Sequence, residues 1–361
     1  MSSFEEDLEA ELAKEEGGVL SVSVAKHEAT KREKTKLKLQ LGRMEAERKR
    51  QEDLIDQLSL INDSGLDSPT WLQPKKKKGQ STATACLMVS DSHFDEVVNP
   101  DEIEGLNAYN REIAQQRLQR TFEKCIRLTD DYLSGFKYDG VTLFLGGDMV
   151  TGTLHDLAES NEAHLPDTVL FWSEQLSAGI EMLRKRYGKV HVTGVVGNHG
   201  RNTFKPRTKG RVRDNNDWLI YKLIERDFKD KDEVTFAIPE SADILVDVYD
   251  TTFRVTHGDQ FTGGGGIAGI ATAIVRGDSR KRKLSMETGQ RYDWLVMGHF
   301  HQLTWYKSII VNGANKGYDE YAYLKGFEYE EPCQAFWVTT PENGVIFNAP
   351  ILTMDKKAEK W

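Results

Sequence analysis

The sequence predicts a layered α/β domain, preceded by an arm of different composition. Three observations support this prediction. Beyond residue 80, short apolar runs of strand length alternate with longer segments of helical periodicity. Several of these runs end in a polar cluster that contains Gly together with Asp, Asn or His. Residues 1–80 instead combine an acidic opening, a basic stretch and few apolar positions.

The arm is expected to contain one long helix between about Lys26 and Ile61. A Lys/Arg-rich stretch runs from Lys31 to Arg50, and Gly and Pro are nearly absent. The apolar positions fall near helical spacing: Leu37, Leu41, Met44, Ile55 and Leu58. The charged run 47–51 interrupts this stripe, so a coiled coil, a solvated helix and a partly disordered arm all stay open. Self-association or binding of a partner protein through the arm stays open with them.

A linker is predicted between the arm and the domain. Residues 62–65 are turn formers, and Pro74 is followed by four lysines and Gly79. We therefore expect residues 1–80 to be arm and linker, and residues 81–361 to form the α/β domain.

Six strands and three helices are predicted in this domain, in alternation. The predicted strands are Ala85–Val89, Gly140–Leu145, Val190–Val196, Ile244–Val248, Thr252–Val255 and Trp294–Met297. The predicted helices are Asn107–Leu133, Leu165–Tyr187 and Asn216–Phe228.

Composition limits the class of protein. A hydrophobic content of 39% is enough for a sizeable core. The net charge of −9 argues against attraction of the whole surface to nucleic acid, although the basic residues are bunched. Cys86, Cys125 and Cys333 are too few and too scattered for a disulfide framework, so we expect buried thiols in a reducing compartment. Without an apolar leader or a run of about 18 apolar residues, a soluble, cytoplasmic chain with no membrane partner is expected.

The polar clusters after the strands contain the candidate site residues. In chain order they are Asp91-Ser92-His93, Gly146-Gly147-Asp148, Gly197-Asn198-His199, His257-Gly258-Asp259 and Gly298-His299-Phe300-His301. Ligands gather outside the carboxyl ends of strands in open α/β sheets, so the clusters can converge. An ordinary turn explains any one of them at least as well. Together they supply carboxylate and amide oxygens with imidazoles, which suit Mn²⁺, Fe or Zn²⁺.

The remaining histidines have weaker claims. His27 and His164 are given no role. His191 lies inside a predicted strand and is expected to be a packed imidazole with a hydrogen-bond partner. His155 follows Asp148 closely enough to be a candidate for supporting the site from behind the ligands.

The ordered clusters resemble the motifs of the calcineurin-like metallophosphoesterase superfamily: Asp-x-His, Gly-Asp, Gly-Asn-His, His-Gly and Gly-His-x-His. The resemblance covers roughly residues 83–350 and implies a two-sheet sandwich flanked by helices. It also implies two divalent metal ions, with Mn²⁺ the leading expectation and Fe, Zn²⁺ or Mg²⁺ as alternatives. By motif position, one ion would be held by Asp91, His93 and His301, the other by Asn198, His257 and His299, with Asp148 bridging both.

The resemblance gives His199 a different role, facing the scissile phosphate and serving its leaving oxygen. Arg201 is close enough in sequence to grip a phosphate oxygen, and an ordinary exposed arginine is an equal alternative. Two positions depart from the family pattern. Thr151 stands where many members have Asp or Asn, and Gly200 stands where an acidic residue is common. Residues 311–315 and 317–321 look like the closing segment of the branch often encoded by bacteriophages.

Two basic clusters bear on the substrate. The first alternates along the chain and would place its cations on one face if extended: Lys205, Arg207, Lys209, Arg211 and Arg213. The second follows the glycine-rich residues 262–266, which we interpret as a mobile lip of the site: Arg276, Arg280, Lys281, Arg282 and Lys283. A phosphate backbone is a natural partner for repeated cations, although solvated loops would explain them too.

The leading expectation is a nuclease or phosphodiesterase that hydrolyses DNA phosphodiester bonds with a metal-activated hydroxide. In class it would be similar to the nuclease subunits of double-strand-break repair complexes. One alternative is a phosphatase or cyclic-nucleotide phosphodiesterase with a small substrate. Another is a nucleic-acid-binding scaffold with a vestigial site, against which the intact ligand set argues.

Overall fold

The computed structural model describes residues 30–31, 34–52, 69–72, 81–152, 161–262 and 269–361. The chain divides into two compact units, Met1–Gly65 and Leu66–Trp361. In the first unit, residues 34–52 form a helix on which Leu37, Leu41 and Met44 are all exposed. Ile55 and Leu58, predicted for the same apolar stripe, lie outside the described residues.

The second unit begins before the boundary near residue 80 that the sequence suggested. Thr70–Leu72 forms a 3-10 turn in which Trp71 and Leu72 are buried. The carbonyl of Leu72 accepts a hydrogen bond of 2.7 Å from the backbone N–H of Tyr249, and both side chains join the core between the sheets. Sequence reasoning did not assign Trp71 and Leu72 to the domain, because their neighbours in sequence are polar and two adjacent apolar residues show no periodicity.

The larger sheet contains six strands in the order β11-β10-β1-β2-β3-β4. Their bounds are β1 Thr82–Val89, β2 Lys137–Leu145, β3 Val190–Gly194, β4 Val234–Ala237, β10 Cys333–Thr340 and β11 Gly344–Leu352. Strands β1 to β4 are parallel to one another, whereas β10 pairs antiparallel with both β1 and β11. Strands β1 and β3 are almost continuously buried, as expected for strands that are covered on both faces.

The smaller sheet contains five strands in the order β5-β6-β7-β9-β8. Their bounds are β5 Asp243–Val248, β6 Thr251–Thr256, β7 Trp294–Met297, β8 Thr304–Tyr306 and β9 Ile309–Val311. The two sheets pack face to face through a buried cluster that includes Phe144, Phe253 and Trp337. The ring centroids of Phe144 and Trp337 are 5.0 Å apart, so aromatic contacts form much of this layer.

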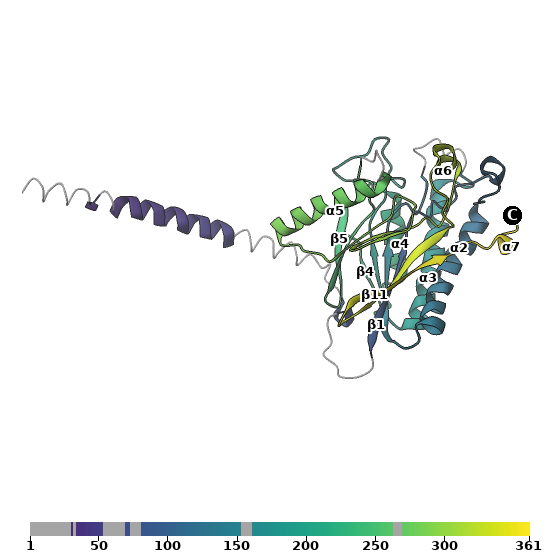
Figure 1. Cartoon of the computed structure of the whole chain (residues 1–361), viewed down its shortest axis with the longest axis horizontal. Helices are drawn as coiled ribbons and strands as arrows, with labels where there is room; N and C mark the ends of the chain where they lie inside the picture. The colour runs from purple at the N-terminus through teal and green to yellow at the C-terminus, as the bar shows by residue number, and fades with distance from the viewer. Residues whose placement is uncertain (1–29, 32–33, 53–68, 73–80, 153–160, 263–268) are drawn as a thin grey trace, which may run out of the picture. The chain divides into compact units, whose positions relative to one another are not determined.

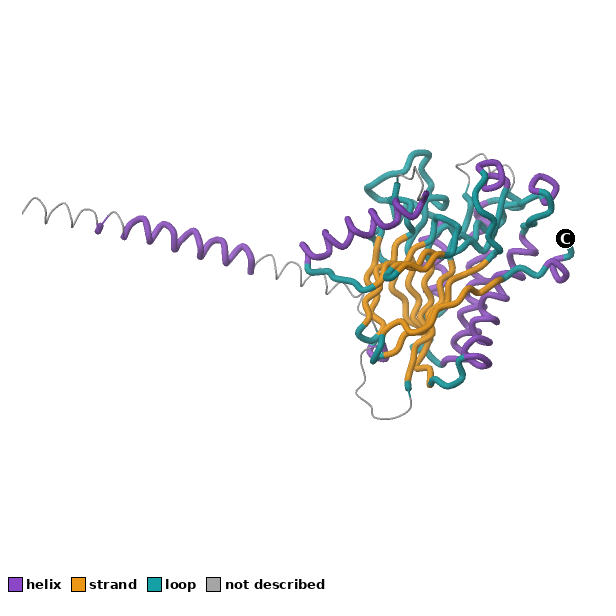
Figure 2. Tube along the Cα trace, in the orientation of Figure 1, coloured by secondary structure: helices purple, strands orange, loops and turns teal. Residues whose placement is uncertain are grey.

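Helices cover both outer faces of the sandwich (Figures 1 and 2). On the larger sheet lie α2 (Arg111–Arg127), α3 (Leu165–Tyr187) and α4 (Asn216–Asp227), whose apolar faces form one core with that sheet. On the smaller sheet lies α5 (Gly269–Thr288), which contributes Ile274 to a third buried cluster. Short helices α6 (Glu320–Lys325) and α7 (Lys356–Glu359) follow. The predicted α/β architecture, two sheets flanked by helices, is confirmed.

The predicted elements are present, with some shifts at their ends. Helix α3 has the predicted bounds. Helix α2 begins at Arg111 and not near Asn107, because the Asn110 side chain accepts a hydrogen bond of 2.9 Å from the N–H of Ile113 and caps the helix there. Helix α5 and strands β4 and β8 to β11 were not predicted.

Two further predictions about the composition can be compared with the structure. Cys86, Cys125 and Cys333 are free and buried, as predicted, and burial raises the pKa of Cys125 to about 12. Within the described ranges, none of the helices has the length and apolar character needed to cross a membrane.

Candidate metal centre

The candidate ligands lie directly after the carboxyl ends of β1, β2, β6 and β7, or shortly after β3. Their backbone is unusual. Five of them have φ angles between 45° and 73°: Asp91, His93, Asp148, His299 and His301. Non-glycine residues rarely adopt this left-handed conformation, and such residues cluster where function requires a particular side-chain direction.

The glycines of the motifs let these strand ends approach one another closely. A Cβ atom added at Gly197 would lie 2.1 Å from Oδ1 of Asp148, and one added at Gly298 would lie 2.2 Å from Oδ2 of Asp91. Neither distance is sterically allowed. Glycine therefore stands directly before Asn198 and His299, because a side chain at either glycine would displace the neighbouring carboxylate.

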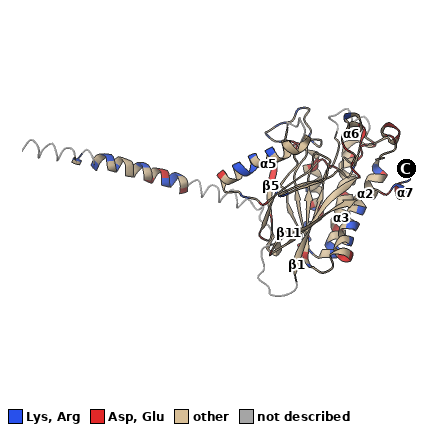
Figure 3. Cartoon of the chain, viewed as in Figure 1, with Lys and Arg blue, Asp and Glu red and all other residues tan. Residues whose placement is uncertain are grey.

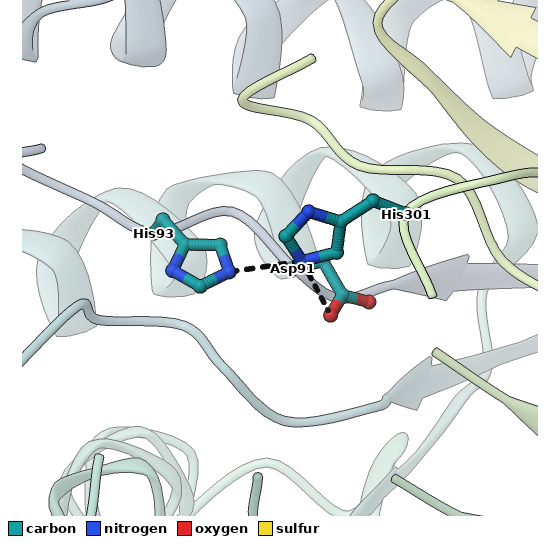
Figure 4. A group of neighbouring side chains, drawn as sticks. All are labelled: Asp91, His93 and His301. Carbon is teal, nitrogen blue, oxygen red and sulfur yellow. Dashed lines mark hydrogen bonds and ion pairs between the residues drawn. The ribbon is translucent and has the colours of Figure 1, made fainter. Parts of the chain in front are cut away.

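The first donor group comprises Asp91, His93 and His301, whose ligand atoms all lie within 4.8 Å of one another. Figure 4 shows the two imidazoles and the carboxylate pointing toward the same small space. The Nε2 atoms of His93 and His301 are 3.1 Å apart, and Nε2 of His301 is 3.4 Å from Oδ1 of Asp91. This arrangement suits one divalent cation.

The second donor group comprises Asp148, His257 and His299, and Asn198 adjoins it. Nε2 of His257 is 3.0 Å from Oδ2 of Asp148 and 3.2 Å from Oδ1 of Asn198. Nδ1 of His257 is 2.8 Å from the carbonyl oxygen of Gly146. Because a carbonyl only accepts, Nδ1 carries the proton in the neutral ring, which leaves Nε2 available to a metal.

Asp148 lies between the two groups and is fully buried. Its Oδ1 accepts a hydrogen bond of 2.7 Å from the N–H of His199, and its Oδ2 lies 3.0 Å from Nε2 of His257. Burial alone would raise the pKa of Asp148, but His257 and His199 lower that pKa well below its ordinary value. A buried, ionised carboxylate that is surrounded by imidazoles fits a shared cation.

The histidines respond to this charge in opposite ways. Burial would lower the pKa of His257, but the neighbouring Asp148 carboxylate raises it to about 10. For His299, burial lowers the pKa to about 4, and the charge of His257 acts in the same direction. Without a bound metal, His257 in the second donor group is therefore a charged imidazolium, whereas His299 is neutral.

His199 lies beside both groups. Its ring centroid is 4.6 Å from that of His93, and its imidazole forms a third possible donor group with His93 and Asp148. Arg201 is half-buried in the same loop, and its contact with a phosphate oxygen stays a prediction. Its guanidinium donates to backbone carbonyls of its own loop, those of Asn198, Thr203 at 3.1 Å and Phe204 at 3.3 Å.

The first basic cluster is not the extended row that alternation predicted. Residues 201–215 form a loop of bends and turns, closed by a bridge between Arg201 and Asn215. Arg211 makes two hydrogen bonds of 2.7 Å to Asp259, and Arg213 pairs with Glu240. The condition for placing all five cations on one face, an extended segment, is therefore not met. Four of them are exposed, Lys205, Arg207, Lys209 and Arg213, and Arg207 lies 4.0 Å from Asp214.

The second basic cluster lies on α5 and not in a loop (Figure 3). Lys281 pairs with Asp243 at 2.5 Å and Arg282 with Asp278 at 2.7 Å, so both stabilise the local structure. The other three side chains of the cluster are exposed: Arg276, Arg280 and Lys283. The glycine run that precedes the helix lies outside the described residues from Gly263 onward.

Two histidines can also be placed. His191 is buried within β3, with Nδ1 2.9 Å from the hydroxyl of Thr235, and burial lowers its pKa to about 4. The prediction of a packed imidazole with a partner is confirmed. His164 is the N-cap residue of α3, and His155 and His27 lie outside the described residues.

Asp217 is a site residue that sequence reasoning missed. Its fully buried carboxylate accepts hydrogen bonds from the backbone N–H groups of Asp148 at 2.9 Å, Met149 at 3.0 Å and Gly197 at 2.9 Å. One side chain from α4 thus fixes the loops after β2 and β3 against each other. The only sequence signal was an acidic residue two positions after the Asn215 cap, which is ordinary at a helix start.

A second network, also missed, supports Asp91. The hydroxyl of Ser90 donates to Oδ2 of Asp91 at 2.5 Å, and Asn312 donates to that hydroxyl at 2.8 Å. Asn312 also donates to Gln334 at 2.9 Å. Strands β1, β9 and β10 are thereby tied to one carboxylate, a convergence that only the three-dimensional fold reveals.

Comparison with known proteins gives distant structural likenesses. No family model matches the chain, and no curated protein matches it. Among solved structures it is similar to a predicted phosphoesterase from Streptococcus pneumoniae, with 12% identity, a TM-score of 0.28, and coverage of 74% of this chain and 98% of the other. It is also similar to Vacuolar Protein Sorting 29 from Cryptosporidium parvum, with 13% identity, a TM-score of 0.31, and coverage of 74% and 97%. A third likeness is to Thermus thermophilus sulfate thiohydrolase SoxB, with 10% identity, a TM-score of 0.29, and coverage of 76% and 58%.

The class of protein follows from the chain's own geometry. Two mixed sheets are flanked by helices, and overlapping groups of His and Asp side chains, linked by His93 and Asp148, lie at the carboxyl ends of the strands. This is a two-sheet α/β sandwich with a candidate metal-binding His/Asp cluster.

Proposed function

We propose that this chain is a two-metal phosphodiesterase that hydrolyses DNA. The observation that carries the proposal is a chain of overlapping donor groups: Asp148 belongs to one group with His257 and His299 and to another with His93 and His199, and His93 also belongs to the group of Asp91 and His301. One group alone would suit a structural ion. Two groups that share a buried carboxylate suit a pair of ions that act together on one phosphate.

The residues in place would hold the two ions as follows: one by Asp91, His93 and His301, the other by Asn198, His257 and His299, with Asp148 common to both. Divalent ions bound there, with Mn²⁺ the leading candidate, would polarise the phosphate and lower the pKa of water. His199 is anchored to Asp148 through its backbone N–H at 2.7 Å. Its imidazole can give a proton to the leaving oxygen near neutral pH.

A nucleic-acid substrate is supported by the loop that follows His199. Phe204 is 77% exposed in this loop, and the exposed Lys205 and Lys209 lie close to it in sequence. An aromatic ring beside cations is the combination with which proteins bind single strands: bases stack on the ring and phosphates approach the ammonium groups. The exposed cations of α5 would extend this basic character.

A second candidate is a phosphatase or cyclic-nucleotide phosphodiesterase that acts on a small substrate. It is favoured by the pairing of Arg211 with Asp259 and of Arg213 with Glu240. Cations already paired within the chain contribute less to a phosphate backbone, and the net charge of −9 opposes one.

The two candidates are separated by one set of assays on the full chain with Mn²⁺. The substrates are labelled single-stranded DNA, labelled duplex DNA, and an aryl phosphate. The test variant combines Phe204→Ala, Lys205→Gln and Lys209→Gln, none of which is a candidate ligand. Its control, Lys137→Gln with Lys185→Gln, removes two exposed charges at the opposite end of the larger sheet.

For a nuclease, the test variant should cleave DNA about 10–100-fold less well at physiological salt, because one stacking contact is worth about 1–3 kcal/mol and two phosphate contacts are lost. The slope of the logarithm of DNA affinity against the logarithm of salt concentration should become shallower by up to about 2. Aryl phosphate hydrolysis should be unchanged, and the control should match the parent. Equal DNA cleavage by the test variant, or activity on the aryl phosphate alone, would favour the small-substrate candidate.

A further inference from the structure

Behind His93, on the side away from the candidate metals, lies a buried polar network. Its members come from the loop after β1, the loop after β2 and the segment before α6: Glu96, Thr151, Lys316 and Asp319. Glu96 and Thr151 are 1% exposed and Lys316 is 2% exposed. Charged groups are rarely buried so completely unless their position matters, because removing them from water is costly.

The hydrogen bonds of this network have only one consistent direction. An ionised carboxylate can only accept, so the hydroxyl of Thr151 donates to Oε2 of Glu96 at 2.7 Å. The oxygen of that hydroxyl is then left to accept from Nδ1 of His93, 3.3 Å away. Oε2 of Glu96 is itself 3.6 Å from the same Nδ1. Both neighbours of Nδ1 therefore favour a proton on that nitrogen.

Lys316 holds the carboxylate of Glu96 in place. Its Nζ atom is 2.8 Å from Oε1 of Glu96 and 2.5 Å from Oδ2 of Asp319. The other oxygen of Asp319 accepts from the N–H of Ala322 at 2.7 Å and caps α6. Lys316 thus joins the start of α6 to the loop that carries Glu96, so Glu96 cannot rotate away without breaking an ion pair.

From this geometry we propose that Thr151, Glu96 and Lys316 are positioning residues, which hold His93 with its proton on Nδ1 and its bare Nε2 toward the candidate metal. A neutral imidazole carries one proton, and a proton on Nε2 would block coordination at that atom. In metal sites a hydrogen bond to the outer nitrogen commonly fixes the ring and its tautomer, and losing it weakens binding about 10–100-fold. The inference rests on the metal role of His93 in the proposed function.

The test uses Thr151→Val in the full chain, because valine keeps the shape and removes only the hydroxyl. Thr142→Val is the matched control: Thr142 is also fully buried, on β2, and its hydroxyl has no hydrogen-bond partner in the described part of the chain. The tautomer of His93 is read in the metal-free protein by NMR with ¹⁵N-labelled histidine, with the signal assigned by its loss in His93→Gln. Mn²⁺ affinity is then measured by titration calorimetry.

In the parent and in Thr142→Val, His93 should be protonated on Nδ1. Thr151→Val should show a mixture of tautomers, and one of its two Mn²⁺ sites should bind about 10-fold or more weakly. A parent His93 protonated on Nε2, or an unchanged tautomer in Thr151→Val, would overturn the inference. If the parent bound no Mn²⁺, the proposed function would fail, and the tautomer in the metal-free protein would still decide whether the network positions His93.

Discussion

The carboxylate of Asp217 gives the sharpest test of how the candidate site is held together. Asp217→Asn keeps the size of the side chain but replaces one acceptor oxygen with an NH₂ group. Oδ2 accepts from the N–H groups of Asp148 and Gly197, and Oδ1 accepts from that of Met149. The best orientation of the asparagine keeps its carbonyl at the Oδ2 position, so its NH₂ group must face the N–H of Met149.

The cost can be worked out from these contacts. One buried N–H loses its acceptor and meets another donor, which costs about 1–3 kcal/mol. The two retained hydrogen bonds become neutral, and charge-assisted bonds are roughly twice as strong as neutral ones. The neutral asparagine also relieves the repulsion from Asp148, which acts in the opposite direction. We therefore expect Asp217→Asn to lower the free energy of unfolding by about 1–3 kcal/mol. The loops that carry Asp148 and Asn198 should loosen together, so affinity for Mn²⁺ should also fall.

The assay is urea unfolding with and without Mn²⁺ at pH 8. Burial, and then the charge of Asp148, raise the pKa of Asp217 to about 7, so at pH 8 the parent carries the ionised form. Asp227→Asn is the control, since Asp227 is exposed at the other end of α4, where it accepts from Ser177 at 3.0 Å and lies 4.0 Å from Arg226. The control should change the free energy by less than about 0.5 kcal/mol. A comparably small effect of Asp217→Asn would refute the claim that this carboxylate fixes the two loops.

Four further outcomes are expected. His199→Ala should keep its bound metal but lose about 10²–10⁴-fold in turnover, and loss of the metal would show that His199 is a ligand. Metal uptake at pH 8 should release a proton, because His257 must give up the one that it holds beside Asp148 with a pKa of about 10; calorimetry in two buffers of different ionisation enthalpy measures this. The raised pKa of His257 stabilises the metal-free fold fully below about pH 6.5, and this stabilisation is lost as the pH rises through about 10. The melting temperature of the metal-free chain should therefore fall between about pH 6.5 and 10. Removing residues 1–65 should leave the melting temperature of the remainder unchanged, whereas removing residues 1–72 should lower it by deleting the buried Trp71 and Leu72.

Sequence reasoning located the strand ends because they have a strong local signal. Buried parallel strands are short apolar runs, and each run here stops at a glycine or a polar side chain. Helix α3 was bounded by Pro166 and by Gly188, whose positive φ of 76° ends the helix. The antiparallel pair β10 and β11 lacked comparable signals: β11 alternates between half-buried and exposed residues, and no motif follows either strand.

The basic loop shows where alternation along the chain misleads. Five cations at every second position would share a face only in an extended segment. Gly210 adopts a φ of 70° and residues 211–214 turn, so the regular spacing in sequence has no regular counterpart in space. Whether Arg211 was free or paired depended on Asp259, which lies 48 residues away in sequence, and pairings of that kind leave no local trace.

The two departures from the family pattern become intelligible when the supporting carboxylates are considered. At position 200, where an acidic residue is common, a Cβ atom would lie 3.0 Å from the Asp217 carboxylate. The space that a larger residue would need there is therefore occupied by Asp217, a residue of α4 that lies outside the motif. At position 151, where Asp or Asn is common, the hydroxyl of Thr151 binds the carboxylate of Glu96. In both places the negative charge lies next to the motif loop but is supplied by another segment. Such a substitution keeps a negative charge near the candidate metal-binding histidines, and metal binding depends on that charge. The candidate ligand set can therefore stay complete although the neighbouring motif residues differ.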